Sequence, residues 1–206
     1  MLSNVHISTM SGKLEGFRAI STNTLTNKFC IKMNKASKNT ICSVCYSHTM
    51  LNGFRKNSAP ALQRNSDLLG SRSLTKEELP SIMDSFFRFS AHGELINIQH
   101  LANLTDIAEH NPHCTFSLWT KRKDYVERLF SYRSKPSNLI LIYSNPKISS
   151  VLPKHLMPKY FDKTFNNVLA DEAVPLQNCT GQKCKDCLLC YKHDTTPTIV
   201  EKVKKY

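Results

Sequence analysis

The chain has 206 residues, and 28 Lys and Arg against 16 Asp and Glu give it a formal net charge of +12. This length suits a single domain, and a composition of 40% hydrophobic and 21% charged residues excludes a disordered chain. The longest apolar run, at residues 139–143, is too short to cross a membrane as a helix. We therefore expect a globular domain with no membrane partner.

The predicted elements begin with short strands and continue as alternating strands and helices. Short strands are expected at 5–7 and 17–20, longer strands at 86–90, 115–119, 138–143 and 165–169, and helices at 45–69, 73–86, 97–109 and 123–132. Pro60 is expected to break or kink the first helix. The run at 138–143 has no polar alternation, which predicts a strand buried on both faces.

Alternating strands and helices predict an α/β protein with a parallel sheet and right-handed crossovers, of a partial (β/α) barrel type. We expect one domain over residues 1–206. Its parts are an N-terminal extension (1–29), an α/β core (30–172) and a Cys-rich C-terminal segment (173–206). The Lys-rich tail at 195–206 reads as a short strand or a loose end.

Eight cysteines stand out in a chain of this kind. Residues 1–11 lack the basic start and apolar stretch of a signal peptide, so we expect a cytoplasmic protein. Structural disulfides are rare in that reducing compartment. The cysteines divide into an early group of three, a late group of four, and Cys114, which we expect to be a small core residue.

The late group has the spacing C-x4-C-x2-C-x2-C and consists of Cys179, Cys184, Cys187 and Cys190. Such a run lets one compact loop aim four thiolates at a single metal centre. We favour an iron–sulfur cluster over a structural zinc, because zinc sites usually separate two C-x2-C pairs by a longer stretch. Two disulfides or four idle thiols are the ordinary alternative.

The early group consists of Cys30, Cys42 and Cys45. Three cysteines suit a four-iron cluster that leaves one iron open for a small-molecule ligand. Zinc with His48 or His6 as a fourth ligand is the alternative.

Polar residues follow the predicted strands at the same relative place three times. In parallel α/β folds, chemistry gathers at these carboxyl ends. The candidate ligand-binding residues are Gly93, Glu94, Thr120, Lys121, Arg122 and Asn145. Ordinary polar loops are the alternative interpretation.

Several of these motifs occur together in a known family. They are Cys42-x-x-Cys45-Tyr46, Arg64-Asn65, Phe87-Arg88-Phe-Ser90-x-x-Gly93-Glu94, Thr120-Lys121-Arg122 and the late cysteines from Cys184 to Cys190. The chain resembles phage and prophage proteins labelled gene-product-88-like, over roughly residues 30–190 and in the same order. The resemblance implies more about architecture than about reaction.

A weaker resemblance is to the radical S-adenosylmethionine enzymes, whose cysteine loop is shorter than the one here. It implies a [4Fe-4S] cluster on Cys30, Cys42 and Cys45. It also implies that His92-Gly93-Glu94 holds the amino group of S-adenosylmethionine, and that the late cysteines form an auxiliary cluster. In this hypothesis Lys121 and Arg122 would hold a carboxylate or phosphate.

A second hypothesis is a zinc-stapled basic protein that binds nucleic acid, or a host partner, without catalysis. The charge of +12 supports it, since Lys and Arg release counterions from phosphates on binding. The basic residues are spread along the chain, however, and a solvated surface would explain them too. Part of this charge would also balance anionic clusters.

Overall fold

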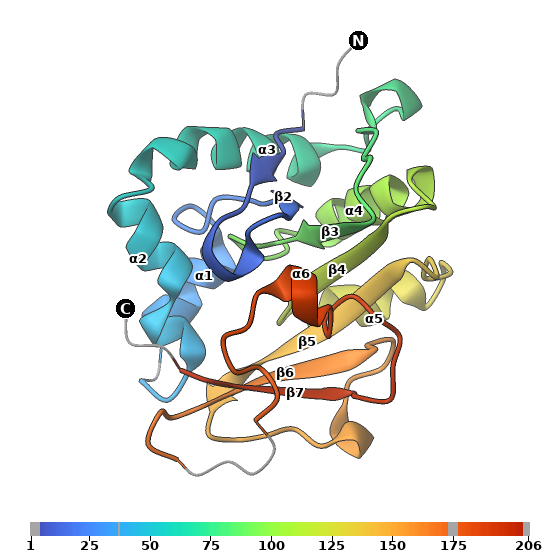
Figure 1. Ribbon diagram of the computed structural model, residues 1–206. Coiled ribbons are helices and arrows are strands. Elements are labelled where there is room, and N and C mark those ends of the chain that lie inside the picture. Colours follow the sequence, from blue (N-terminus) through green and yellow to red (C-terminus); the bar gives the residue numbers. More distant parts are fainter. Residues whose placement is uncertain (1–4, 37, 173–176, 204–206) are drawn as a thin grey trace.

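A computed structural model of the protein describes residues 5–36, 38–172 and 177–203. Within this part, a seven-stranded sheet has the same strand order in space as in the chain (Figure 1). The strands are β1 (Ser8–Thr9), β2 (Arg18–Ile20), β3 (Phe86–Phe89), β4 (Thr115–Thr120), β5 (Leu139–Ile148), β6 (Lys163–Val168) and β7 (Thr198–Lys202). β1 is antiparallel to β2, and all later neighbours are parallel. The predicted α/β class with a parallel sheet is confirmed.

The α-helices lie in the connections between parallel strands. They are α1 (Lys28–Asn34), α2 (Tyr46–Asn52), α3 (Ala59–Ser71), α4 (Ile98–His110), α5 (Lys123–Phe130) and α6 (Cys184–Cys187). Short 3-10 helices are η1 (Gly12–Leu14), η2 (Ile41–Val44), η3 (Lys56–Ser58), η4 (Lys76–Glu78) and η5 (Lys154–Leu156). None of the helices in the described ranges is long and apolar enough to cross a membrane.

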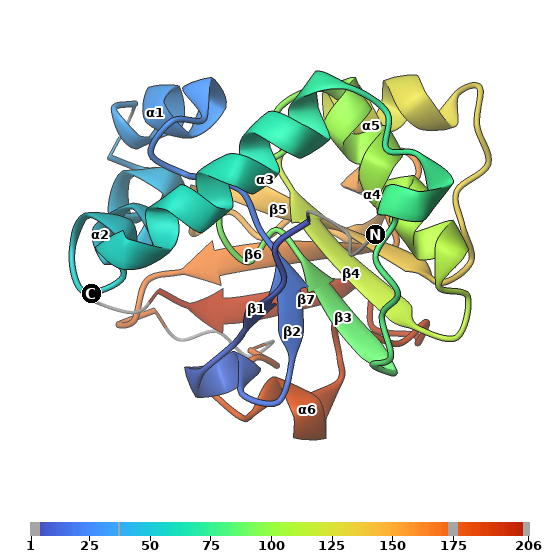
Figure 2. The same ribbon diagram turned by 90° about the horizontal axis from the view of Figure 1, so that it is seen from above.

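A sequential strand order with right-handed crossovers places successive helices on the same face of the sheet. Figure 2 shows α3, α4 and α5 together on one side and α6 on the other. The main apolar core lies between the sheet and these three helices. Its fully buried members include Leu69, Phe87, Leu104, Phe116 and Leu141.

The opposite face of the sheet is covered by the C-terminal segment. Two smaller apolar clusters form there, one around Phe17 and Tyr191 and one around Ile140, Ile142 and Phe165. In β5, Leu139 and Leu141 face the helices while Ile140 and Ile142 face this second layer. The prediction that this strand is buried on both faces is therefore confirmed.

The predicted helix at 73–86 is wrong. The structure has the short η4 there, and the Thr75–Glu78 capping box that suggested a helix caps this single turn. Pro80 is poorly placed in a helix interior. The Asn111 side chain holds the extended segment, since its Nδ2 donates to the Pro80 carbonyl (2.9 Å) and its Oδ1 accepts the Ile82 N–H (2.7 Å).

Other boundaries move less. The predicted helix at 45–69 is divided into α2, η3 and α3, with Pro60 in the first turn of α3, where proline is tolerated. The first strand lies at Ser8–Thr9 rather than at 5–7. The tail supplies β7, which pairs with β6, while residues 204–206 lie outside the described residues.

Candidate functional site

The three early cysteines lie in the long connection between β2 and β3. Cys30 belongs to α1, Cys42 to η2, and Cys45 is the N-cap residue of α2. Asn27 caps α1, and its Oδ1 accepts the Cys30 N–H at 3.1 Å. Asn34 Nδ2 donates to the Cys42 carbonyl oxygen at 2.8 Å, which ties η2 to α1.

Glu94 follows β3 and its carboxylate is buried and fixed. Oε1 accepts hydrogen bonds from Thr120 Oγ1 (2.5 Å) and from the Leu95 N–H (2.8 Å). Oε2 accepts the Lys121 N–H at 2.9 Å. A carboxylate oxygen accepts two hydrogen bonds, so Oε2 keeps capacity for one donor from a ligand.

The early thiols interact electrostatically with Glu94, which follows β3, and with Lys121, which follows β4. Burial raises the pKa of Cys30, and negative charge on Glu94 and Cys45 raises it further. Burial alone would lower the pKa of Lys121, but the charges of Cys42, Glu94 and the other two early thiols raise it. Cys30, Cys42, Cys45, Glu94 and Lys121 thus lie within electrostatic range of one another near the carboxyl edge of the sheet.

Asn27 and Lys121 extend this site to neighbouring elements. Asn27 Nδ2 donates to the Glu94 carbonyl oxygen at 2.9 Å, so the residue that caps the helix of Cys30 also holds the end of β3. Lys121 Nζ donates to Ser144 Oγ of β5 at 2.9 Å. The site thus draws on several successive connections of the sheet.

Gly93 allows the ends of β2 and β3 to interlock. Its φ is +78°, and a Cβ atom there would lie 2.2 Å from Thr22 Oγ1. The Gly93 N–H donates to Thr24 Oγ1 at 2.8 Å, and the Thr22 N–H donates to the His92 carbonyl at 3.2 Å. Glycine is required at this position because any side chain would both clash and strain the backbone.

The loop after Cys45 is fastened to the end of β3. The Tyr46 hydroxyl donates to the Ala91 carbonyl, and His92 Nδ1 and Ser47 Oγ are joined at 2.7 Å. Burial lowers the pKa of His92 to about 4, with help from the charges of Arg55 and Arg88. His92 is therefore a neutral, buried support for α2.

Two predicted ligand-binding residues have other partners. Arg122 forms an ion pair with Asp124 (2.6 Å), and its guanidinium lies 3.6 Å from the Tyr125 ring centroid and 5.2 Å from that of Phe29. Asn145 Nδ2 donates to Asn166 Oδ1 (3.1 Å) and to the Ser150 carbonyl. Arg122 thus packs beside α1, and Asn145, within β5, ties that strand to β6 and to the segment that follows β5.

The histidines considered as fourth zinc ligands contact other groups. His6 Nε2 lies 3.1 Å from Ser8 Oγ, and the His48 ring lies beside Asn52 Nδ2 at 3.3 Å.

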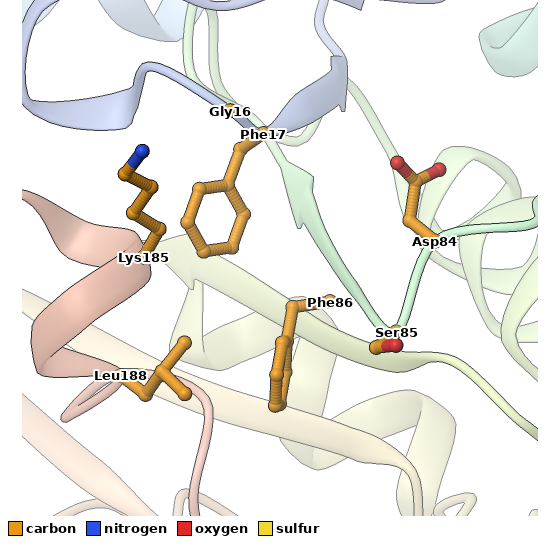
Figure 3. Close-up of a pocket in the computed structure, with 7 residues that line it drawn as sticks. All are labelled: Gly16, Phe17, Asp84, Ser85, Phe86, Lys185 and Leu188. Atoms are coloured by element: carbon orange, nitrogen blue, oxygen red, sulfur yellow. The ribbon is translucent and has the colours of Figure 1, made fainter.

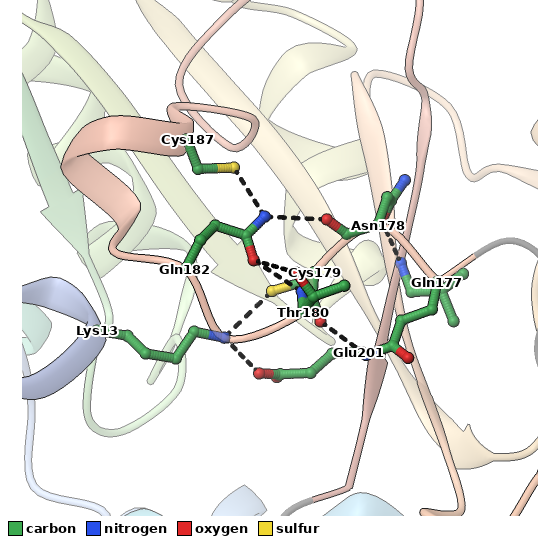
Figure 4. A network of polar contacts seen from close by, with 9 residues as sticks. Lys13, Gln177, Asn178, Cys179, Thr180, Gln182, Cys187 and Glu201 are labelled. Carbon is green, nitrogen blue, oxygen red and sulfur yellow. Dashed lines mark hydrogen bonds and ion pairs between the residues drawn. The ribbon is translucent and has the colours of Figure 1, made fainter.

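The late cysteines lie on the face of the sheet opposite α3–α5. Cys179 is held beside β7, where its N–H donates to the Val200 carbonyl at 3.0 Å, and Lys13 Nζ donates to its Sγ at 3.2 Å (Figure 4). Gln182 Nε2 donates to Cys187 Sγ at 3.4 Å. Lys13 also pairs with Glu201 (2.5 Å), which links η1 to this segment.

A buried cation faces the late group from β3. Arg88 is 6% exposed, and its guanidinium carbon lies 3.8 Å from the Trp119 ring centroid. Its Nε has no hydrogen-bond partner within the described residues. Burial raises the pKa of Cys190 to about 12, and the Arg88 charge acts against this rise. Burial also raises the pKa of Cys184, again opposed first by Arg88.

All eight cysteines are free thiols in the structure. Cys114 is 1% exposed within the main core, as predicted. In the described ranges, no group of three or more His, Cys, Asp or Glu side chains is placed to hold a metal ion. Metal binding at either cysteine group therefore stays a prediction.

A pocket of about 210 Å³ lies away from the early cysteines (Figure 3). Phe17, Phe86 and Leu188 supply its apolar lining, and Asp84 and Lys185 stand at its sides. It borders α6 and the start of β3. Asp84 is already paired with Arg18 (2.5 Å), so the pocket is a mixed polar and apolar recess beside the late group.

Three residues that shape these sites were not predicted as site residues from the sequence. Arg88 was visible as a lone charge in the apolar run Phe86–Phe89, which is a sign of a buried cation. Asn27 had the form of an N-cap two residues before Phe29. Nothing in the sequence pairs Lys13 with Cys179, since 166 positions separate them.

The fold and the two cysteine groups define an α/β protein that carries clustered free thiols on a mostly parallel sheet. The Gene product 88 family matches residues 9–174, and the chain belongs to that family. The match ends before Cys179. No curated protein and no solved structure matches the chain.

Proposed function

We propose that this protein binds an iron–sulfur cluster, [4Fe-4S] in type, through Cys30, Cys42 and Cys45, and that the cluster's open iron binds a small molecule. The observation that carries this proposal is a set of hydrogen bonds that ties the early segment to the strand ends. Asn27 joins the Cys30 N–H to the Glu94 carbonyl, Asn34 joins α1 to the Cys42 carbonyl, and Glu94 Oε2 accepts the Lys121 N–H. Sulfur ligands select iron–sulfur clusters and zinc among biological metals. We place the protein in a cytoplasm, that of the host cell if the gene is phage-encoded.

The surroundings of the early group fit a ligand with an amino group and a carboxylate. Glu94 Oε2 has capacity for one more donor, and Lys121 Nζ supplies a cation beside it. S-adenosylmethionine carries both groups, and the sequential parallel strands suit the weaker resemblance to the enzymes that use it. Gly93 lets the backbone approach closely.

The chemistry at such a centre would be electron transfer to the bound molecule, which the cluster supplies. The protein's own residues would bind and orient the ligand. Glu94 would hold its amino group, Lys121 its carboxylate, and the α1–η2–α2 connection would exclude water. Thr120 fixes the Glu94 carboxylate for this task.

For the late group we propose a second, closed metal site. Its support is Arg88, because a buried guanidinium whose Nε lacks a hydrogen bond requires nearby negative charge. Four metal-bound thiolates would supply that charge. Raised thiol pKa values imply that metal binding releases protons here.

Metal analysis tests both assignments. We expect protein purified without oxygen to contain iron and acid-labile sulfide. Cys42→Ser with Cys45→Ser should remove about half of the iron, and Cys184→Ser with Cys187→Ser the other half. Cys114→Ala is the matched control and should keep all of it. A colourless preparation that contains zinc alone would reject the iron–sulfur proposal and favour a non-catalytic, zinc-stapled protein.

A further inference from the structure

The positive charge of this protein is concentrated on the segment that carries the early cysteines. Residues 16–66 contain eight Lys and Arg and no Asp or Glu, so this quarter of the chain holds +8 of the net +12. The segment includes β2, α1, α2 and the start of α3. The remaining charges largely balance.

The exposed lysines of this segment form a row. Lys28, Lys32 and Lys35 are exposed and spaced four and three residues apart, which places them on the same face of α1. The helical rise of about 1.5 Å per residue spaces them by roughly 6 Å and 4.5 Å along the axis. Lys38 continues the row beyond the helix, and Lys56 is exposed after α2.

Among the residues that the structure describes, no ion pair neutralises these cations. The ion pairs of the described residues involve Lys13, Arg18, Arg72, Arg122, Arg133, Lys135, Lys163 and Lys183. None of the lysines on α1 is among them. The row therefore presents positive charge to solvent at the rim of the early site.

An exposed aromatic ring lies in the same connection. Phe54 is 78% exposed directly after α2, and the Arg55 guanidinium lies 5.9 Å from its ring centroid. Both views place α1 and α2 near each other (Figures 1 and 2). Cations that track a phosphate backbone, combined with a free aromatic ring for base stacking, are typical of single-strand binding surfaces.

We propose that Lys28, Lys32, Lys35, Lys38 and Phe54 form a cationic rim that binds single-stranded nucleic acid and presents a nucleotide to the early cysteine site. The assignment of the nucleotide as substrate rests on the proposed function, whereas the strand binding does not. The row is too long for a single small anion. The exposed ring favours a polymer with bases over one with phosphate alone.

The first test is the binding of a short, labelled single-stranded oligonucleotide by fluorescence anisotropy across a range of salt concentrations. Lys28→Gln with Lys32→Gln and Lys35→Gln should weaken binding about tenfold or more and reduce the salt slope by about 2. The matched control replaces Lys76, Arg128 and Lys154 by Gln, which lowers the net charge equally on the segments before β3, β5 and β6. An equal loss of affinity in both variants, or no binding by the wild-type protein at low salt, would reject the proposal that the cationic rim binds single-stranded nucleic acid.

Phe54 tests the role of the bases. Phe54→Ala should weaken binding about tenfold, as the loss of one stacked base would. Tyr132→Ala is the control, since Tyr132 is 70% exposed at the end of α5. If Phe54→Ala binds as wild type and inorganic polyphosphate competes as well as the oligonucleotide, the surface recognises phosphate alone and the proposal fails.

Thiol protection tests whether the strand reaches the early site, and it requires no bound metal. We expect a saturating oligonucleotide to protect Cys42 and Cys45 from a maleimide reagent several-fold, while Cys187 reacts at an unchanged rate, as read by peptide mass spectrometry. Strand binding without protection of the early cysteines would refute the presentation of a nucleotide there. If the purified protein contains no iron but the oligonucleotide still protects the early cysteines, the iron–sulfur proposal fails and the proposal of nucleic-acid binding by the cationic rim stands.

Discussion

The early and late cysteine groups differ in how the fold surrounds them. The early thiols sit at the carboxyl edge, where Glu94 and Lys121 leave bonding capacity for a ligand. The late thiols lie on the sheet face, covered by Phe17 and Tyr191 and balanced by Arg88. The cysteines of both groups are half-buried, so the difference lies in what surrounds them. Loops and strand ends enclose the early group, whereas the late group packs on the sheet beside two small apolar clusters.

This difference predicts that the late group stabilises the protein and the early group serves its chemistry. Cys184→Ser with Cys187→Ser should lower the free energy of unfolding of the metal-loaded protein by about 5 kcal/mol, because metal binding there is coupled to folding. Cys42→Ser with Cys45→Ser should lower it far less. Chemical denaturation without oxygen measures both. Equal losses would contradict the division of roles.

Two glycines with positive φ allow the early and late regions to be compared, since Gly93 lies beside the early group and Gly181 lies in the late loop. Gly93→Ala should destabilise the protein by about 3 kcal/mol, since its Cβ would lie 2.2 Å from Thr22 Oγ1 as well as strain the backbone. Gly181, in the late loop, has φ +103°, but a Cβ added there would meet no atom within 4 Å, so Gly181→Ala should cost only about 1 kcal/mol. Thermal unfolding of the two variants gives the order directly. A larger loss of stability in Gly181→Ala than in Gly93→Ala would show that the ends of β2 and β3 are not tightly packed at Gly93.

The pH dependence of stability should trace in part to the early site. The folded-state pKa of His92 is about 4, below the ordinary value of about 6.5, because burial disfavours its charged form. Its contribution to stability is therefore complete above pH 6.5 and is lost as the pH falls toward 4, up to about 3 kcal/mol. His92→Asn should reduce this acid sensitivity in urea titrations. An unchanged pH profile would show that His92 does not titrate as a buried group.

Arg88 should have opposite effects with and without metal. Arg88→Met removes a buried cation, so the metal-free protein should gain about 1 kcal/mol or remain unchanged. The metal-loaded protein should release its late-site metal to a chelator about tenfold faster, and Arg88→Lys should restore part of the difference. A loss of stability in both states would show that Arg88 acts through packing on Trp119 instead.

Much of the architecture could be predicted from periodicity alone. The strands around Phe87, Phe116 and Leu141 and the helices α4 and α5 carry strong patterns, and their order predicts the parallel sheet. The helix expected at 73–86 failed because Asn111, from a distant turn, holds that segment extended. Pro80 is the local sign against this helix, whereas the Asn111 contact is tertiary and leaves none.

The candidate site was predicted in part for the same reason. Strand-end positions identified Glu94, Thr120 and Lys121, because topology brings such positions together. The same rule also selected Asn145, whose amide turns back to Asn166. Spacing identified both cysteine groups, but the cation opposite the late group comes from the middle of β3 and depends on which face Arg88 occupies.

The central claim is that the early group holds a cluster with an open iron. It is tested most directly by electron paramagnetic resonance of the reduced Cys184→Ser, Cys187→Ser variant, in which the early group alone remains. We predict a cluster signal that changes shape when S-adenosylmethionine is added, and that loses this response in Glu94→Gln. A protein without a cluster signal, or a signal that the added ligand leaves unaltered, would contradict the account.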